Sequence, residues 1–253
     1  MLLEARGLGL DAGDRRLCTG LDLAMGSGET WAILGANGSG KTTLLHALAG
    51  LRAPDRGSVL LEGRDLRSLR PRAVARRRGL LLQDPEPGLA ADVMQTVLTG
   101  RHPHLRAWGW ETAADYRIAA AALAAMDLGA FAARPLATLS GGERRRVEIA
   151  ALLAQDPPLC LLDEPTNHLD LRHQMQVLGL FAARSRRPGH LTVMVLHDVN
   201  LATRFCSHGL LLTEGGYRQG RLDEILDTAV LEQIYGCSFR LAGSAGDRMF
   251  IPA

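Results

Sequence analysis

Lysine is almost missing from this chain. Of 253 residues, 29 are lysine or arginine, and Lys41 is the only lysine. The simplest explanation for so much arginine is a GC-rich genome. The one lysine that remains is informative, because an ammonium is a compact charge that fits between phosphate groups where a planar guanidinium fits poorly.

Long apolar runs and paired cysteines are missing as well. The apolar runs, such as residues 191–196, are much shorter than the about 20 residues that a membrane-spanning helix needs. The first residues include Glu4 and Arg6 and have no sustained apolar core, so we expect no signal peptide. The four cysteines show no CxxC spacing, which is typical of reduced thiols in a cytosolic protein. A net charge of +2 does not by itself indicate a nucleic-acid partner.

Short leucine-rich or β-branched runs alternate with helical patterns, which predicts an α/β fold with a mainly parallel sheet. The predicted strands are residues 30–34, 80–82, 159–163, 191–196 and 209–213. The predicted helices include residues 43–49, ended by Gly50, and the alanine-rich residues 112–126. Strand signals vanish between residues 84 and 156. We therefore expect one domain, with a core formed by residues 1–83 and 157–253 and an inserted α-helical subdomain at residues 84–156.

A glycine-rich stretch follows the first predicted strand and precedes a helix. Residues 35–42 fit the phosphate-loop pattern GxxxxGK[ST] in the context that the pattern requires. Glycines let the backbone amides surround phosphate oxygens at the positive end of the helix dipole. Lys41 is expected to meet the β- and γ-phosphates, and the Thr42 hydroxyl to bind Mg²⁺. The predicted nucleotide-binding residues here are Gly35, Asn37, Gly38, Ser39, Gly40, Lys41, Thr42 and Thr43.

An apolar strand that ends in two acids predicts further functional carboxylates. Asp163 falls at the carboxyl end of the predicted strand, where α/β sheets bind their ligands, and Glu164 follows it. Beside a phosphate loop, Asp163 is expected to hold Mg²⁺ through a water, and Glu164 to orient or deprotonate the attacking water. The alternative is that two acids simply end a strand before Pro165 starts a turn.

Two more polar residues end predicted strands. His197 follows residues 191–196 and could hydrogen-bond a γ-phosphate, with a simple polar strand cap as the alternative. Gln83 follows residues 80–82. Its neutral amide can reach Mg²⁺ and the attacking water, and it can dissociate from them without leaving a buried charge. The predicted catalytic residues are Glu164, His197 and Gln83. The predicted metal-binding residues are Thr42, Gln83 and Asp163.

The stretch Leu139-Ser140-Gly141-Gly142-Glu143 reads as the start of a helix. Together with the phosphate loop, Gln83, Asp163-Glu164, Asp170 and His197, in this order, it makes the chain resemble the ATP-binding cassette ATPase family. The resemblance covers nearly the whole chain, and the LSGGE stretch is specific to that family among phosphate-loop proteins. It implies a RecA-like core with N-terminal antiparallel strands, and ATP and Mg²⁺ as cofactors.

The resemblance also implies a homodimer. Ser140, Gly141 and Gly142 are expected to bind the γ-phosphate of ATP held by the opposite copy, and glycines at a helix N-terminus do expose amide donors to an anion. One chain carries one phosphate loop and one such helix, so two composite sites need two chains. Residues 167–170 resemble the loop that crosses the dimer interface, which places Asp170 near the nucleotide.

One position departs from the family pattern. Members usually carry an aromatic residue near the N-terminus that stacks on adenine, and aligning residues 8–13 with that region puts Ala12 there. Arg15 or Arg16 could cover the base through a guanidinium plane, but solvation at the surface is the stronger interpretation. We expect loose nucleotide selectivity.

Two segments could contact other molecules. Six arginines lie in residues 67–78, where a solvated helix face is the stronger interpretation and acidic lipid or nucleic acid the alternative. Residues 88–105 correspond to the groove that receives a short helix of the membrane subunit in transport ATPases. His102 and His104 lack a third metal ligand, so we interpret them as groove or surface residues.

Residues 99–105, 163–174 and 231–236 resemble bacterial importers of iron–siderophores, haem and cobalamin. This implies an ATP-hydrolysing subunit that dimerises around two Mg·ATP and drives a polytopic membrane permease. A periplasmic or lipid-anchored substrate-binding protein would be an indirect partner, and no nucleic acid is expected. The expected location is the cytoplasmic face of the inner membrane, as a peripheral subunit. The alternatives are a soluble ATPase of iron–sulfur cluster assembly, a subunit of another transporter class, and a cassette that acts on nucleic acid.

Overall fold

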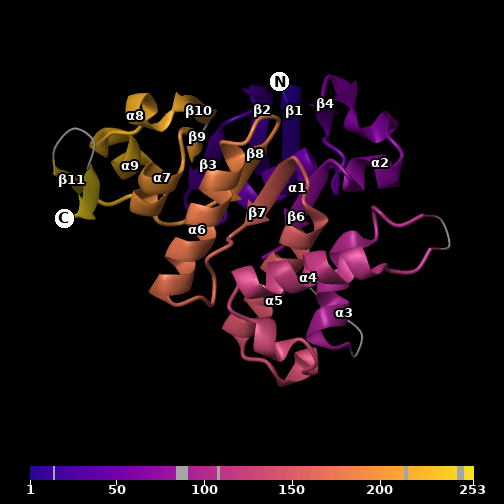
Figure 1. Ribbon diagram of the computed structural model, residues 1–253. Coiled ribbons are helices and arrows are strands. Elements are labelled where there is room, and N and C mark those ends of the chain that lie inside the picture. The colour runs from indigo at the N-terminus through magenta and orange to yellow at the C-terminus, as the bar shows by residue number, and fades with distance from the viewer. Residues whose placement is uncertain (14, 84–90, 107–108, 214–215, 244–247) are drawn as a thin grey trace. The chain divides into compact units, whose positions relative to one another are not determined.

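The computed structural model describes the chain except residues 14, 84–90, 107–108, 214–215 and 244–247 (Figure 1). The chain packs into two units, which we describe separately. The first unit contains residues 1–69 and 178–253, and the second contains residues 70–177.

Parallel strands form the centre of the first unit. β3 (Thr30–Gly35) lies between β8 (Leu191–Val195) and β9 (His208–Thr213) and is parallel to both, while β10 (Gly216–Arg221) pairs antiparallel with β9. Every residue of β3 and β8 is buried. Continuous burial is typical of parallel strands that are covered on both faces, and it explains their uninterrupted apolar sequences.

An antiparallel sheet forms the N-terminal part of the same unit. Its order is β2 (Arg15–Met25), β1 (Leu3–Ala12), β4 (Arg56–Leu61) and β5 (Arg64–Asp65). Gly57 in β4 has a φ of 76°, and a Cβ there would collide with the backbone carbonyls of Arg6 and Gly7. Only glycine therefore allows β4 to approach β1 at this point.

The helices of the first unit follow its strands. α1 (Lys41–Ala49) ends at Gly50, whose φ of 73° gives the expected left-handed cap. α7 (Val199–Phe205), α8 (Leu222–Ile225) and α9 (Thr228–Tyr235) precede a C-terminal hairpin of β11 (Phe239–Ala242) and β12 (Met249–Pro252). The side chain of Asn200 in α7 binds both backbone groups of Phe250, at 2.8 and 3.0 Å, and so fixes this hairpin.

The second unit is mainly helical. A parallel pair, β6 (Arg78–Leu81) and β7 (Leu159–Asp163), accompanies α2 (Pro71–Ala75), α3 (Val93–Leu98), α4 (Ala113–Ala125) and α5 (Gly141–Gln155), with α3 and α4 packed against α5. α6 (Leu171–Ser185) belongs to this unit up to Val177. Between residues 91 and 156, the described residues form no strand and only one isolated bridge, between Asp92 and Pro135.

The predicted fold class is confirmed, and the five predicted strands and the helices at residues 43–49 and 112–126 are present. The bounds of the helical subdomain, 84–156, stay a prediction. No helix in the described part of the chain has the length and apolar character needed to cross a bilayer.

One interpretation was wrong, because the arginine-rich stretch is not a single helix face. It is divided between a 3₁₀ turn (Leu66–Ser68), α2 and β6. Arg72 and Arg76 donate to the carbonyl of Pro103, at 3.1 and 2.7 Å, and burial lowers the pKa of Arg78. Pro71 favours a helix start at that point, because its fixed φ suits the first helical position.

Candidate active site

The phosphate loop of the first unit follows β3 and runs directly into α1. Gly38 and Gly40 have φ angles of 74° and 95°, which only glycine adopts readily. Lys41 is 6% exposed, and its ammonium donates to the carbonyl oxygens of Gly35 and Ala36, both at 2.9 Å. Carbonyl oxygens of the loop thus hold the cation that a triphosphate would meet.

Two features of this loop fit a phosphate ligand. The cap residue of α1, Gly40, has no side chain, so an anion could approach the N-terminus of the helix without displacing a capping side chain. Ser39 Oγ is buried and has no hydrogen-bond partner among the described residues. A Cβ at Gly35 would lie 2.6 Å from that hydroxyl, so the turn is too tight for a larger residue.

His197 lies at the same sheet edge as the phosphate loop. β3 and β8 are parallel, and the amide of Leu196 donates to the carbonyl of Ile33 at 3.3 Å. His197 comes next, is exposed, and precedes Asp198, whose carboxylate caps α7. The topology therefore brings His197 and the loop to one edge, while its contact with a γ-phosphate stays a prediction.

Gln83 and Glu164 are hydrogen-bonded in the second unit. Gln83 Nε2 donates to Glu164 Oε2 at 3.2 Å, and Asn167 Nδ2 donates to the same oxygen. Glu164 is 9% exposed, and Asp163 beside it at the end of β7 is fully buried. Residues predicted from two separate strand ends, Gln83 after β6 and Glu164 after β7, are thus brought together, and Asn167 joins them.

Arg145, which has no assigned place in the motifs, contacts this cluster. Its side chain is 3% exposed. Its guanidinium donates to the carbonyl oxygens of Leu82, Asp163 and Glu164 and to the carboxylate of Glu148. The available sequence signal is helical spacing, because Ile149 and Leu152 follow Arg145 at i+4 and i+7 and mark the buried face of α5.

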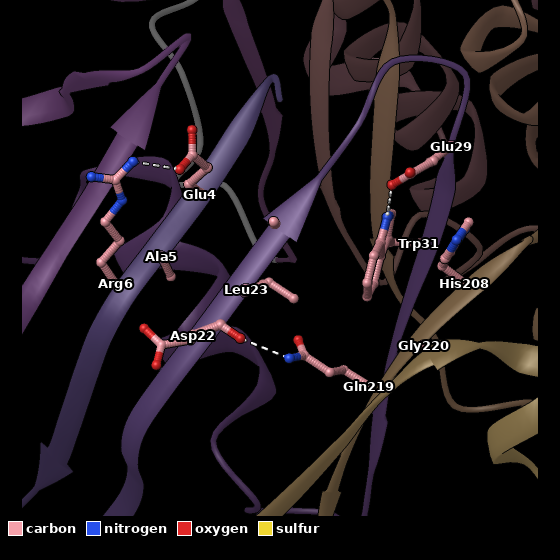
Figure 2. A pocket seen from close by; sticks show the side chains of 11 residues that line it. Glu4, Ala5, Arg6, Asp22, Leu23, Glu29, Trp31, His208, Gln219 and Gly220 are labelled. Atoms are coloured by element: carbon pink, nitrogen blue, oxygen red, sulfur yellow. Dashed lines mark hydrogen bonds and ion pairs between the residues drawn. The ribbon is translucent and has the colours of Figure 1, made fainter.

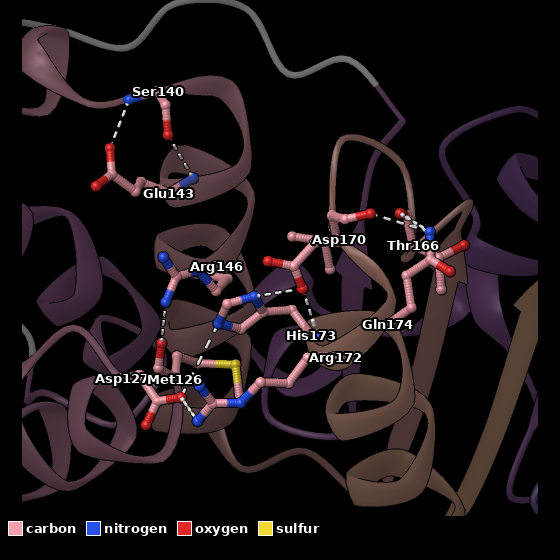
Figure 3. Close-up of polar contacts among 11 residues, drawn as sticks. Met126, Asp127, Ser140, Glu143, Arg146, Thr166, Asp170, Arg172, His173 and Gln174 are labelled. Carbon is pink, nitrogen blue, oxygen red and sulfur yellow. Dashed lines mark hydrogen bonds and ion pairs between the residues drawn. The ribbon is translucent and has the colours of Figure 1, made fainter.

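The helix that begins after Ser140 has a capping box. Ser140 Oγ accepts from the Glu143 amide at 3.3 Å, and the Glu143 carboxylate accepts from the Ser140 amide at 2.7 Å (Figure 3). The hydrogen bond from the Ser140 backbone is the largest cause of a lowered pKa of Glu143, and the hydrogen bond with the Ser140 side chain is the next. A Cβ at Gly142 would lie 2.7 Å from the carbonyl oxygen of His168, whereas one at Gly141 would meet nothing closer than 3.9 Å. Packing against His168 therefore requires a glycine at position 142, whereas position 141 has room for a side chain.

Asp170 is held by the side chain and backbone of His173. Its Oδ1 accepts from the His173 amide at 2.9 Å and lies 2.8 Å from the ring Nδ1 (Figure 3). Both bonds lower the pKa of Asp170, and the bond from the His173 backbone has the larger effect. The ring Nε2 faces Asp127 at 3.9 Å, and Arg172 faces the same carboxylate at 3.4 Å. The ring thus links Asp170 to the turn after α4, while the contact of Asp170 with a nucleotide stays a prediction.

The region aligned with adenine binding is described in part. The side chains of Ala12 and Arg15 lie outside the described structure. Arg16 is 64% exposed and faces Asp11 at 3.7 Å. Leu17 lies against Gly40 of the phosphate loop, since a Cβ there would be 2.9 Å from a Leu17 methyl carbon. An aliphatic side chain of β2, not a ring, therefore packs on the loop.

The segment expected to receive a membrane subunit lies outside the described residues at positions 88–90. Farther along, His104 Nε2 lies 2.8 Å from the carbonyl oxygen of Gln155, which fixes it to the end of α5. His102 is 59% exposed at its side chain and faces Glu111 at 3.7 Å. The two histidines thus contact different partners, a backbone carbonyl for His104 and a carboxylate for His102.

A separate hollow of about 500 Å³ lies in the first unit between β1, β2 and β10 (Figure 2). On its wall, Trp31 stacks on His208 with 5.0 Å between ring centroids and donates to Glu29 at 2.7 Å. Glu4 binds Arg6 at 2.8 Å. These carboxylates bind groups of the protein itself, so we assign no ligand to this hollow.

The candidate residues fall into two sets. The first unit contributes the phosphate loop, with Thr42 and Thr43 at the start of α1, and His197. The second unit contributes Gln83, Ser140, Gly141, Gly142, Asp163, Glu164 and Asp170. Hydroxyl, amide and carboxylate oxygens are the ligands that Mg²⁺ prefers, so the residue types predicted as its ligands fit the ion.

Comparisons with known proteins show which family the chain resembles over most of its length. Residues 18–167 match the family described as ABC transporter. The chain is 37% identical over 243 residues to the achromobactin transport ATP-binding protein of Dickeya dadantii, covering 94% of this chain and 89% of the relative. It is 40% identical over 245 residues to the hemin import ATP-binding protein of Myxococcus xanthus, covering 93% and 90%. A solved metal-chelate type ABC transporter in an inward-facing conformation superposes with a TM-score of 0.84 at 28% identity, over 100% of this chain and 97% of that chain.

The family match covers more than half of the chain, and both relatives are matched over most of their length. The phosphate loop, the LSGGE helix start and the two strand-end acids occur in the order typical of this family. The chain therefore belongs to the ABC transporter family, as an ATP-hydrolysing subunit of the kind found in siderophore and haem importers.

Proposed function

We propose that two copies of this chain close around two Mg·ATP and drive a membrane permease that imports a metal chelate. The chelate would be an iron–siderophore, haem or cobalamin. The chain would sit at the cytoplasmic face of the membrane, bound to the permease, and a substrate-binding protein would deliver the chelate from outside. ATP favours the closed dimer because it binds that state better than the open one.

The phosphate loop carries the ATPase part of this proposal. Its buried ammonium, its uncapped helix N-terminus and the buried Ser39 hydroxyl supply donors for the oxygens of a triphosphate. Thr42, Gln83 and Asp163 would hold Mg²⁺, which supplies positive charge to the phosphate oxygens. Glu164 would orient the attacking water, and Gln83 holds its carboxylate in place.

The start of α5 supports the dimer. The capping box uses the Ser140 hydroxyl and the Glu143 carboxylate, but Gly141 stays open and exposed at the helix N-terminus. An anion from a second chain could bind there without displacing a side chain. We propose that this anion is the γ-phosphate of ATP on the partner's phosphate loop.

The substitution Glu164→Gln tests the hydrolytic part. We expect kcat for ATP to fall by about 100-fold or more, because the amide cannot accept a proton and positions the water poorly. ATP should then trap a stable dimer, which light scattering after gel filtration detects. Glu224→Gln, at an exposed position of α8, is a matched control and should behave like the wild type. Wild-type turnover in Glu164→Gln would refute the role of this carboxylate.

The transport part is tested with a membrane permease that copurifies with this chain. Reconstituted in liposomes, the permease should change the ATPase rate and accumulate one class of chelate in the presence of ATP. Copurification with cluster-assembly proteins, together with no response to the permease, would favour the soluble iron–sulfur alternative.

A further inference from the structure

Glu164 has an unusual backbone conformation. Its φ is +46°, in the left-handed region that L-residues other than glycine rarely adopt. Successive carbonyl groups alternate in direction along a strand but point the same way in helical conformations. The change from strand to left-handed conformation at Glu164 therefore turns the carbonyls of Asp163 and Glu164 to one side.

The guanidinium of Arg145 binds on that side. Its Nη2 donates to the carbonyl oxygens of Asp163 and Glu164, at 2.7 and 2.9 Å. Its Nη1 donates to the carbonyl oxygen of Leu82, the residue before Gln83. The carboxylate of Glu148, 2.9 Å away, offsets the charge. A planar group with five donors suits this arrangement, whereas an ammonium would not reach all the acceptors in one plane.

Arg145 belongs to the helix whose first turn carries the LSGGE residues. It lies in the second turn of α5, after the capping box of Ser140 and Glu143. At the first turn, Gly142 packs on the carbonyl oxygen of His168, in the loop that follows Glu164. Two contacts, one from each turn, therefore join α5 to the backbone on both sides of Glu164.

We propose that Arg145 is a positioning residue for Glu164 and Gln83. It holds Glu164 in the left-handed conformation that directs the carboxylate toward Gln83 and Asn167. It also transmits a displacement of the LSGGE turn, caused by the partner's nucleotide, to the catalytic carboxylate of its own chain. This inference rests on the proposed function, because it assigns Glu164 to hydrolysis and the LSGGE turn to nucleotide binding.

The substitution Arg145→Met tests the role, because methionine keeps an unbranched apolar stem and removes all donors. We expect kcat to fall by about 100-fold, the size of effect that a misplaced catalytic group produces. KM for ATP and the equilibrium binding of a fluorescent ATP analogue should stay within about twofold, because the phosphate loop belongs to the other unit. Arg145→Lys keeps the charge and part of the hydrogen bonding, so its kcat should lie between that of the wild type and that of Arg145→Met.

A neighbouring substitution serves as the control. Arg144→Met removes a guanidinium that donates to the Ala137 carbonyl at the surface. This variant should keep kcat within about twofold of the wild type. Circular dichroism and thermal unfolding establish that each variant is folded.

The kcat and ATP binding of these variants decide whether Arg145 positions Glu164. Wild-type kcat in folded Arg145→Met, or a parallel loss of kcat and ATP binding, would overturn the positioning role. If Arg145→Met does not fold, wild-type kcat in Arg145→Lys overturns it instead, and a reduced kcat with normal ATP binding supports it. Glu164→Gln, assayed in parallel, distinguishes the two levels of inference. If it stays active, the proposed function fails, and if it is inactive while Arg145→Met is fully active, only the positioning role fails.

Discussion

The two glycines at the start of α5, Gly141 and Gly142, meet different structural requirements. Gly142 lies against the His168 carbonyl, so a methyl group there forces the loop of residues 164–170 to shift. Gly141 has ordinary van der Waals room for a Cβ. The same residue type thus meets a packing requirement at one position and leaves a ligand site open at the other.

We predict that Gly142→Ala lowers the free energy of unfolding by about 1–3 kcal/mol, as overpacking of a tight contact does. Gly141→Ala should change it by about 0.5 kcal/mol or less. Urea unfolding followed by circular dichroism measures both. Equal effects of the two substitutions would contradict the contact with His168.

The motif residues could be predicted at this scale because their identity and local spacing define their chemistry. Lys41, Asp163 and Glu164 were placed from short stretches of sequence alone. Arg145 could not be placed in the same way, because its acceptors are backbone carbonyls at the ends of β6 and β7, and the sequence does not show where a carbonyl points. Helical spacing indicates that Arg145 is buried, but it does not indicate which groups its charge binds.

At the scale of elements, the start of α4 is held by one carboxylate. Asp115 accepts from the backbone and side chain of Thr112 and pairs with Arg101 at 2.9 Å. The bonds from Thr112, backbone first, and the bond from Arg101 lower its pKa from 3.8 to about 2. The carboxylate therefore joins the first turn of α4 to the turn after α3.

This low pKa predicts a pH-dependent contribution to stability. A carboxyl whose folded pKa lies below its unfolded value contributes fully above pH 3.8, and the contribution disappears as the pH falls through about 2. Asp115→Asn should therefore lower the free energy of unfolding by about 1 kcal/mol at pH 7, and the difference should shrink below pH 3.8. Urea unfolding across this range measures it, and a constant difference would contradict the role of the ionised carboxylate.

Elements with strong periodicity or clear end signals were predictable from the sequence. β7 was predicted at its observed bounds, because four buried apolar residues stand between Pro158 and two acids, the first of which ends the strand. The arginine-rich stretch misled the prediction, because it was treated as one element although Pro71 begins a new helix and Arg78 already lies in β6. Charge composition does not show where one element ends and the next begins.

At the scale of the whole molecule, composite sites predict complementation between two inactive variants. Lys41→Ala removes the cation of the phosphate loop, and Gly141→Asp places a carboxylate where the partner's γ-phosphate would bind. Each homodimer then has two defective sites, but a mixed dimer has one site with both parts intact. Mixing should restore up to about a quarter of the wild-type ATPase rate, since half of randomly formed dimers are mixed and each has one intact site. A mixture no more active than the separate variants would contradict sites shared between chains.

The isolation of Lys41 affects how this protein can be chemically modified. The only side-chain amine of the chain is buried and bonded to Gly35 and Ala36, so acylating reagents and amine crosslinkers have no exposed lysine to attack. Slow acylation at this one position would therefore report opening of the loop, undiluted by signal from other lysines. Protection of the Lys41 peptide by added ATP, measured by mass spectrometry, would turn this acylation into a binding assay.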